Sequence, residues 1–396
     1  MFPKSNYVKN QNLNSLSLYV HWPYCESKCP YCDFNSHLTE TINNKDWITS
    51  YINQLNEMKK FLDLYNIEFK NLDTIFFGGG TPSLMPLEIL DNVINTAAEI
   101  FSFSKNIEIS LEANPSSFDI NKFKRMRQIG VNRISLGVQS LKNKNLKFLG
   151  RKHSYLECEK AIEAALINFN NVSIDLIYAL YNQTIKDWLS ELKTVLNKFD
   201  LQHISLYQLT IEEGTKFFSD FKKGKIKIID NDTAFELFNI TNSVLSDYGY
   251  KRYEVSNFAK KGFESKHNLN YWTSENWIGI GPGAYGRLWH KNQNSKRIEI
   301  KNFRNPKTWL YKNAQSANFE DIKVLDNHQT DIDTLLMGLR LDKGIKINKL
   351  NNRNLVNNEK FLDLEKKGFI VKRNGNIKIK KNHIAKLNSI VDYLLY

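Results

Sequence analysis

The sequence predicts an α/β fold in which short strands alternate with longer helices. Six runs rich in β-branched and aromatic residues are separated by five segments whose apolar residues recur at helical spacing. Strands and helices that alternate in this way build parallel βα units, which form a barrel or an open sheet. Polar residues and glycines mark the carboxyl ends of five of these runs, and in a barrel such ends meet at one mouth. The barrel is therefore the favoured architecture.

The individual elements follow from these patterns. The strands are expected in residues 16–22, 72–80, 106–114, 133–140, 172–180 and 203–211, and the helices between them in residues 45–65, 86–101, 119–130, 154–169 and 184–199. After about residue 290 the pattern changes. A helix closed by Gly344, a second helix near 359–369 and a hairpin turning on Asn374-Gly375 indicate a small winged-helix-like α+β unit. We therefore expect two domains, residues 1–290 and residues 291–396.

Composition and charge indicate a globular protein. Hydrophobic residues make up 41% of the chain, and no apolar run approaches the roughly 18 residues that a spanning helix needs. The opening residues are polar and lack an apolar stretch, so we expect no secretory signal and a cytoplasmic location. The net charge of +13 comes from basic residues scattered along the chain rather than from one helix face. No nucleic-acid partner is expected on this basis.

One stretch, LYVHWPYCESKCPYCDFNSH at residues 18–37, holds three of the four cysteines, namely Cys25, Cys29 and Cys32. In a reducing compartment, thiols this close together are more typical of a metal or cluster site than of disulfides. Three thiolates can hold three irons of a four-iron cluster and leave the fourth iron open. Structural zinc is the alternative, with His21 or His37 as the fourth ligand. Cys158 lies alone in a helical pattern and is interpreted as a small core residue.

A glycine triplet ends the second predicted strand, in the segment FFGGGTPS. Residues without a Cβ let the backbone approach a ligand closely, although a triplet alone is most often a tight turn. Because it stands one strand after the cysteines, the triplet favours a ligand site that both motifs share. It also favours the cluster over zinc.

Together these motifs resemble a known family. The chain carries YVHWPYCESKCPYCDF, GGGTPS, LEANP, RISLGVQS, DLIYAL, LYQLTIEEGT and LLMGLRLDKGI. Their order resembles that of radical S-adenosylmethionine (SAM) proteins related to oxygen-independent coproporphyrinogen III oxidase, from about Tyr19 to Ile345. The resemblance implies a partial (β/α)6 radical SAM barrel, with a [4Fe-4S] cluster at its mouth and SAM bound to the open iron.

The resemblance also implies roles for individual residues. The cluster would be ligated by Cys25, Cys29 and Cys32. The SAM pocket would be formed by Tyr19, Tyr31, Gly79, Gly80, Thr81, Glu112, Gln139, Arg151 and Asp175. The family often reads Asp-Leu-Ile-Tyr-Gly-Leu-Pro-Gly after the fifth strand, whereas this chain has Ala179, Tyr181 and Asn182 at the small or rigid positions. The geometry of that loop, and with it the role of Asp175, stays open.

Two branches of the family share this barrel. The porphyrinogen oxidases have a fourth cysteine two residues after the third, where this chain has Phe34. HemW-type haem chaperones carry His-Asn-x-x-Tyr-Trp, which matches HNLNYW here through His267, Asn268, Tyr271 and Trp272. A neutral imidazole can ligate haem iron, and the two aromatic rings offer flat apolar surface to the macrocycle. Taken alone, such a motif is more often a buried histidine beside core aromatics.

The resemblance thus implies a haem chaperone that binds haem, a [4Fe-4S] cluster and SAM. It would draw electrons for the cluster from a reductant and pass haem to an unidentified acceptor protein, which could be membrane-associated. Two alternatives remain. One is oxidative decarboxylation of coproporphyrinogen III, which the absent fourth cysteine weakens. The other is a zinc-stabilised nucleic-acid-binding module, based on the net charge and the winged C-terminal region.

Overall fold

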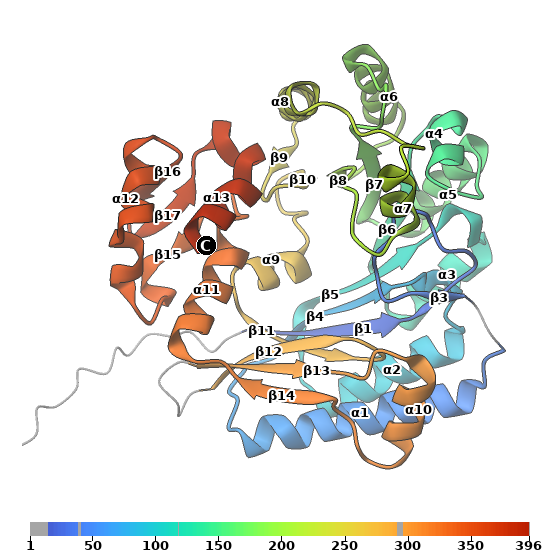
Figure 1. Cartoon of the computed structure of the whole chain (residues 1–396). Coiled ribbons are helices and arrows are strands. Elements are labelled where there is room, and N and C mark those ends of the chain that lie inside the picture. The colour runs from blue at the N-terminus through green and yellow to red at the C-terminus, as the bar shows by residue number, and fades with distance from the viewer. Residues whose placement is uncertain (1–14, 39–40, 118, 291–295, 396) are drawn as a thin grey trace, which may run out of the picture.

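Six parallel strands form the centre of a twelve-stranded sheet (Figure 1). The computed structural model describes residues 15–38, 41–117, 119–290 and 296–395. The central strands are β1 (Leu16–Trp22), β4 (Leu72–Gly79), β5 (Phe103–Ala113), β6 (Arg133–Gln139), β7 (Val172–Tyr178) and β8 (His203–Gln208). They lie side by side in chain order, and each pairs in parallel with the next. The six predicted strands and their parallel arrangement are confirmed.

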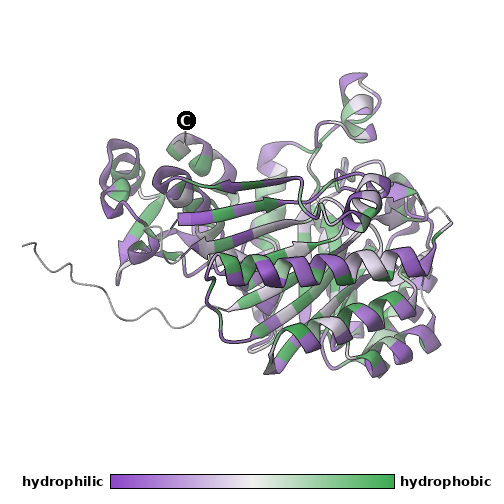
Figure 2. Ribbon diagram, turned by 90° about the horizontal axis from the view of Figure 1, so that it is seen from below, coloured by the Kyte–Doolittle hydropathy of each residue, from purple (hydrophilic) through white to green (hydrophobic). Residues whose placement is uncertain are grey.

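Helices connect the central strands and cover the outer face of the sheet (Figure 1). The five expected helices are α1 (Asn44–Leu64), α2 (Leu87–Ile100), α3 (Ile120–Ile129), α5 (Tyr155–Asn168) and α6 (Ile185–Lys198). A short α4 (Asn143–Phe148) precedes α5 and was not expected. Purple and green alternate along these helices in Figure 2, as an amphipathic helix with one apolar face requires.

Local capping signals explain where several of these helices begin. Ser154 and Glu157 form a reciprocal capping box at the start of α5. The Thr184 side chain accepts a backbone N–H at the start of α6. From there Trp188 and Leu192, four residues apart, are buried against the sheet. The helical periodicity seen in the sequence is therefore the periodicity of the buried face.

The barrel is open, because β1 pairs with β11 (Asn276–Ile280) and not with β8. Beyond β11 the sheet continues through β12 (Tyr285–His290), β13 (Lys296–Lys301) and β14 (Asp321–Val324). At the opposite edge, β10 (Asn257–Ala259) and β9 (Lys251–Arg252) follow β8. The helices in this part of the chain are α7 (Lys216–Lys222), α8 (Asn231–Asp247), α9 (Lys266–Trp272) and α10 (Pro306–Ala314). The result is an open barrel of six parallel strands, with β11 added in parallel beside β1 and antiparallel strands continuing the sheet at both edges.

The expected domain boundary at residue 290 lies inside this sheet. β12 and β13 pair in antiparallel register from Tyr285 opposite Lys301 to His290 opposite Lys296. The change from parallel to antiparallel pairing comes earlier, between β11 and β12, where Trp277 lies opposite Arg287. We propose a boundary after β14, near residue 325.

A small C-terminal unit follows, shown in orange and red in Figure 1. It contains α11 (Asn327–Gly338), β15 (Ile345–Lys346), α12 (Glu359–Lys366), β16 (Ile370–Arg373), β17 (Asn376–Ile379) and α13 (Leu387–Leu395). The predicted hairpin joins β16 to β17 through Asn374 and Gly375, whose φ angles of 52° and 72° fit a primed turn. β15 adds a third strand to this hairpin. It was not predicted, because its two residues are too few to show a periodic pattern. None of the helices in the described residues is long and apolar enough to span a membrane.

Candidate functional site

The cysteine loop begins just after β1. Two short parallel strands, β2 (Tyr24–Cys25) and β3 (His37–Leu38), close its ends. The three thiols of Cys25, Cys29 and Cys32 are half-buried. The Thr81 hydroxyl donates to Cys25 Sγ at 3.3 Å, and Arg151 Nη1 donates to Cys29 Sγ at 3.5 Å. Groups that follow β4 and α4 thus converge on the sulfurs.

The middle of the loop packs against α7 and the turn after α4. The Pro30 carbonyl accepts the Phe217 N–H at 2.8 Å, and the Tyr31 ring lies 6.3 Å from the Phe217 ring. Gly150 has a φ of +67°, and a Cβ there would lie 2.5 Å from Pro30 Cδ. Close packing therefore holds Tyr31 beside Cys29. Phe34, at the position of the oxidases' fourth cysteine, is 61% exposed.

The glycine triplet brings the end of β4 unusually close to the end of β1. Gly79 has a φ of +113°, and a Cβ there would lie 2.5 Å from His21 Cε1. A Cβ on Gly80 would lie 2.7 Å from the Tyr24 carbonyl oxygen. The Gly80 N–H also donates to the Trp22 carbonyl at 2.7 Å. These glycines therefore fix the entrance to the cysteine loop.

His21 uses both ring nitrogens and is not free to act as the fourth zinc ligand. Its Nδ1 lies 3.0 Å from Tyr19 Oη, and its Nε2 lies 2.9 Å from the Asn35 carbonyl oxygen. Burial lowers the pKa of His21 to about 4, so the ring is neutral, with Nε2–H donating and Nδ1 accepting. The Asn35 side chain donates to the Pro282 carbonyl at 3.0 Å, which ties the loop to the turn between β11 and β12. No three His, Cys, Asp or Glu side chains of the described residues are arranged around a single metal ion.

Two carboxyl groups lie at the centre of the barrel, on β5 and β7. Glu112 accepts the Gly79 N–H at 3.3 Å, and burial together with the charge of Asp175 raises its pKa to about 8. Asp175 accepts the Ser135 hydroxyl at 3.2 Å, and burial raises its pKa as well. The nearby guanidinium of Arg133, itself buried, acts against both shifts. A half-buried pair of this kind favours a cationic ligand, which would relieve the repulsion between the carboxylates.

Gln139 and Arg151 lie together beside the end of β6. A Cβ on Gly137 would lie 3.0 Å from Gln139 Nε2 and 3.5 Å from Arg151 Nη2. Arg151 Nη2 donates to the Gly137 carbonyl at 2.8 Å. Its Nε is buried and has no hydrogen-bond partner in the part of the chain that the structure describes. A buried guanidinium donor left unpaired can be satisfied by a carboxylate ligand.

The loop after β7 keeps a backbone that glycine would favour. Ala179 and Asn182 stand at positions where the family often has glycine, and both adopt left-handed conformations, with φ of 59° and 62°. Asp175 still lies within β7, with its Oδ1 at Ser135. The unusual sequence of the loop therefore leaves Asp175 at the barrel centre.

The HNLNYW motif forms the helix α9, which packs against β4 and β11. His267 is 1% exposed, with Nδ1 at 2.6 Å from Thr74 Oγ1 and Nε2 at 2.7 Å from Tyr271 Oη. The His267 N–H donates to Glu108 Oε1 at 3.2 Å. Burial lowers the pKa of the His267 ring to about 3, so the imidazole is neutral. In this conformation the motif is a buried histidine beside aromatics.

The other motif residues have different surroundings. Asn268 is half-buried, and its N–H donates to the Ser265 hydroxyl that caps α9. The Trp272 ring lies 4.5 Å beneath the Arg340 guanidinium of the C-terminal unit. The Tyr271 ring meets the Trp277 ring edge-on at 4.8 Å.

Tyr19 connects the cysteine loop with α9. Its hydroxyl contacts His21, whereas its ring lies 6.4 Å from the rings of both Phe76 and His267. The partners of His267 are Thr74, near the start of β4, and Glu108, in the middle of β5, whereas Gly79 and Glu112 stand at the ends of the same strands. The two groups of predicted residues therefore lie at different levels of one barrel interior.

Comparison with known proteins identifies the family. The Radical SAM superfamily profile matches residues 19–195. The chain is 34% identical to the mitochondrial radical S-adenosyl methionine domain-containing protein 1 of Dictyostelium discoideum, over 96% of this chain and 94% of that protein. It is 33% identical to the heme chaperone HemW of Lactococcus lactis, over 85% and 84%. The chain belongs to the HemW family of radical SAM proteins. The HemW of Haemophilus influenzae is 39% identical, over 70% of this chain and 71% of that protein.

A solved structure supports the fold of this HemW-family chain. Coproporphyrinogen III oxidase HemN of Escherichia coli superposes with a TM-score of 0.78, over 96% of this chain and 90% of that one. The two sequences are 18% identical, so the likeness shows a shared fold. The predicted radical SAM fold is thereby confirmed, and the sequence relatives confirm the predicted family.

Sequence reasoning missed several residues that surround the HemW-family motifs. Arg133 is 2% exposed, and its charge acts on both barrel carboxyl groups and on His267. Thr74 and Glu108 hold α9 in place. A charged residue inside an otherwise apolar strand was the available signal, because Arg133 opens RISLGVQS and Glu108 interrupts NIEISLEAN.

Proposed function

We propose that this chain is a haem chaperone that carries a [4Fe-4S] cluster, binds SAM and passes haem to an acceptor protein in the cytoplasm. The observation that carries the proposal is that one chain combines the cysteine loop with the HNLNYW helix. The same chain is 33–39% identical to four proteins named heme chaperone HemW. Haem would be the cargo, whereas the cluster and SAM would be bound cofactors.

The cluster site would use the thiolates of Cys25, Cys29 and Cys32. Their half-buried position and the donors from Thr81 and Arg151 fit thiolate ligands, since hydrogen bonds to sulfur stabilise the charged form. The cluster and SAM, when bound and supplied with electrons by a reductant, provide radical chemistry. Haem transfer does not in itself require that SAM be cleaved.

The SAM site would lie between the cysteine loop and the barrel carboxyl groups. Glu112 and Asp175 supply negative charge for the sulfonium and ammonium groups, and the unpaired Nε of Arg151 is available to the carboxylate. The glycine turn lets the backbone of β4 approach the ligand. The remaining contacts would come from Tyr19, Tyr31, Gly79, Gly80, Thr81 and Gln139.

The haem site would use His267 as the iron ligand. Its imidazole is neutral, as ligation requires, and Tyr271 and Trp272 offer aromatic surface on the same helix. Asn268 completes the motif. The acceptor protein is unidentified, and it could be associated with a membrane.

A haemin titration of the anaerobically reconstituted protein tests this function. We expect a saturating shift of the Soret band in the wild type and loss of that shift in His267→Ala. The same protein, given SAM, a reductant and coproporphyrinogen III, should leave this substrate unconverted. Absence of haem binding in the wild type, or decarboxylation of the porphyrinogen, would count against the chaperone and favour the oxidase alternative.

A further inference from the structure

The hydrogen bonds around His267 determine which ring nitrogen carries the proton. Thr74 donates its own hydroxyl hydrogen to Ser17 Oγ at 2.8 Å, so its oxygen is left to accept from His267 Nδ1–H. The lone pair of the neutral ring is therefore on Nε2. That nitrogen lies 2.7 Å from Tyr271 Oη and accepts the tyrosine hydroxyl hydrogen.

In this arrangement the Tyr271 hydroxyl caps Nε2, the one nitrogen of His267 that could bind iron. Ligation needs a free lone pair, and both Nδ1 and Nε2 of the buried His267 ring are engaged. The capping residue Tyr271 stands four residues after His267 on α9, where helix geometry puts two side chains on one face. The spacing of the HNLNYW motif thus serves the hydrogen bond between its own histidine and tyrosine.

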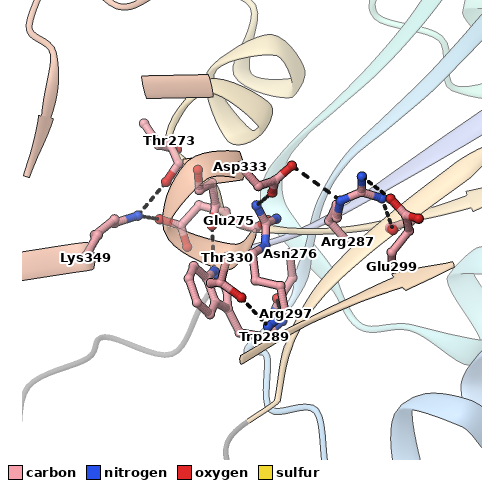
Figure 3. A network of polar contacts seen from close by, with 12 residues as sticks. Thr273, Glu275, Asn276, Arg287, Trp289, Arg297, Glu299, Thr330, Asp333 and Lys349 are labelled. Atoms are coloured by element: carbon pink, nitrogen blue, oxygen red, sulfur yellow. Dashed lines mark hydrogen bonds and ion pairs between the residues drawn. The ribbon is translucent and has the colours of Figure 1, made fainter. Parts of the chain in front are cut away.

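The end of α9 that bears the cap is held by the C-terminal unit. The Arg340 guanidinium covers the Trp272 ring at 4.5 Å and pairs with the fully buried Glu254 at 3.2 Å. Lys349 Nζ donates to the Thr273 carbonyl at 2.5 Å and to Glu275 Oε1 at 2.6 Å (Figure 3). Both cations follow α11. Their partner Trp272 is the last residue of α9, and Thr273 and Glu275 come directly after it.

The indole N–H of Trp272 indicates that the contact with Arg340 is not the only environment of this side chain. The indole Nε1–H is buried and has no acceptor within the described ranges. Buried indole N–H groups usually find a partner, and an unpaired one has a cost that a change of conformation or a polar ligand can remove.

We propose that His267 is a gated haem ligand, in which the Tyr271 hydroxyl caps Nε2 and the C-terminal unit, through Arg340 and Lys349, holds the cap closed. This inference rests on the proposed binding of haem at His267. Haem would enter when the C-terminal unit moves away from α9, because Tyr271 can then turn its hydroxyl away from the ring. Release to an acceptor would use the same movement in reverse, with the Tyr271 hydroxyl reclaiming Nε2.

Stopped-flow mixing of the reconstituted full-length protein with haemin tests the cap. Tyr271→Phe removes the hydroxyl and keeps the ring, so we expect haem to associate about tenfold faster, the factor that loss of one hydrogen bond allows. The matched control is Tyr250→Phe, which removes a buried hydroxyl bonded to the Leu201 carbonyl at 2.7 Å away from α9. Its association rate should equal that of the wild type. A Tyr271→Phe variant that binds haem at the wild-type rate, or more slowly, would overturn the cap.

Amide hydrogen exchange over residues 266–273 tests, without haem, whether Arg340 and Lys349 hold α9 in place. Arg340→Gln and Lys349→Gln should each speed exchange in α9 and also speed haem association. Lys372→Gln, which removes a cation paired with Glu365 within the C-terminal unit, should leave both unchanged. Unchanged exchange in both Arg340→Gln and Lys349→Gln would refute the proposed role of the C-terminal unit, whether or not haem binds. By contrast, haem binding that survives His267→Ala would refute the proposed ligand itself.

Discussion

Glu112 places an ionisable carboxyl group at the centre of the barrel, where its charge is expensive without a ligand. Its pKa of about 8 lies above the ordinary value of 4.5, first because of burial and then because of the charge of Asp175. The folded protein therefore binds this proton more tightly than the unfolded chain does. It follows that the free energy of unfolding should fall as pH rises from about 4.5 through about 8.

Replacing Glu112 by Gln should remove much of that pH dependence. In SAM-free protein we expect Glu112→Gln to be more stable than the wild type by about 2–4 kcal/mol at pH 9 and nearly equal to it at pH 5. Urea unfolding followed by circular dichroism at the two pH values measures this. Glu57→Gln, which alters an exposed i,i+3 pair with Lys60 on α1, is the control and should show the wild-type dependence. A pH profile of Glu112→Gln as steep as that of the wild type would contradict the shifted pKa.

The turn at the end of β4 is the element that joins the cysteine loop to the barrel. A Cβ at Gly79 would lie 2.5 Å from His21 Cε1, and a Cβ at Gly80 would lie 2.7 Å from the Tyr24 carbonyl oxygen. Only glycine therefore lets this turn lie so close to the chain that leaves β1. The Thr81 hydroxyl that follows them reaches Cys25 Sγ. A change in this turn should therefore affect both the stability of the fold and the loading of the cluster.

We expect Gly79→Ala to destabilise the protein by about 3 kcal/mol or more, because a Cβ there meets His21 and a positive φ is costly for alanine. Gly214→Ala is the matched control, since Gly214 has a φ of +83° but nothing within 4 Å of a built Cβ. It should lose only about 1–2 kcal/mol. Chemical denaturation gives the stabilities, and iron content after reconstitution should fall in Gly79→Ala alone. Equal losses in the two variants would show that crowding at His21 is unimportant.

At the scale of elements, the sequence was most informative where one periodicity extended over a whole strand or helix. The six parallel strands and five crossover helices were predictable because burial repeats with a fixed period along each. β15, with two residues, carries no such period, and the pairing of β12 with β13 depends on register between segments. The contact of Thr81 with Cys25 is one that parallel topology leads us to expect, because Thr81 directly follows a strand beside the cysteine loop. Arg151, which contacts Cys29, follows α4 and was expected near the cysteines only from the family resemblance. The contacts of His267 with Thr74 and Glu108 were not predictable, because they join residues more than 150 positions apart through a helix whose packing no local pattern records.

On the scale of the whole molecule, a buried polar network joins the C-terminal unit to the sheet (Figure 3). Arg297 on β13 is fully buried between the rings of Trp277 and Trp289, at 4.9 Å and 5.1 Å. Its Nη1 pairs with Asp333 Oδ2 of α11 at 2.5 Å. A buried cation of this kind depends on its counter-charge, so the attachment of the C-terminal unit depends on Asp333.

Asp333→Asn should therefore destabilise the protein by about 3–5 kcal/mol, since it leaves the Arg297 guanidinium buried without a negative partner. Asp363→Asn removes the same charge from an exposed pair between α12 and Lys367, the residue after the helix, and should cost no more than about 0.5 kcal/mol. Urea denaturation of both variants provides the comparison. Similar, small losses in the two would mean that the network does not hold the C-terminal unit in place.

On this proposal one barrel holds two separate sites, a cluster and SAM site at the cysteine loop and a haem site on α9. The most direct test is an anaerobic haemin titration, followed at the Soret band, of the wild type, His267→Ala and the triple variant Cys25→Ser, Cys29→Ser, Cys32→Ser. We predict that the triple variant binds haem as the wild type does and that His267→Ala does not. Loss of haem binding in the triple variant, with binding retained in His267→Ala, would contradict two separate sites and place haem at the cysteine loop.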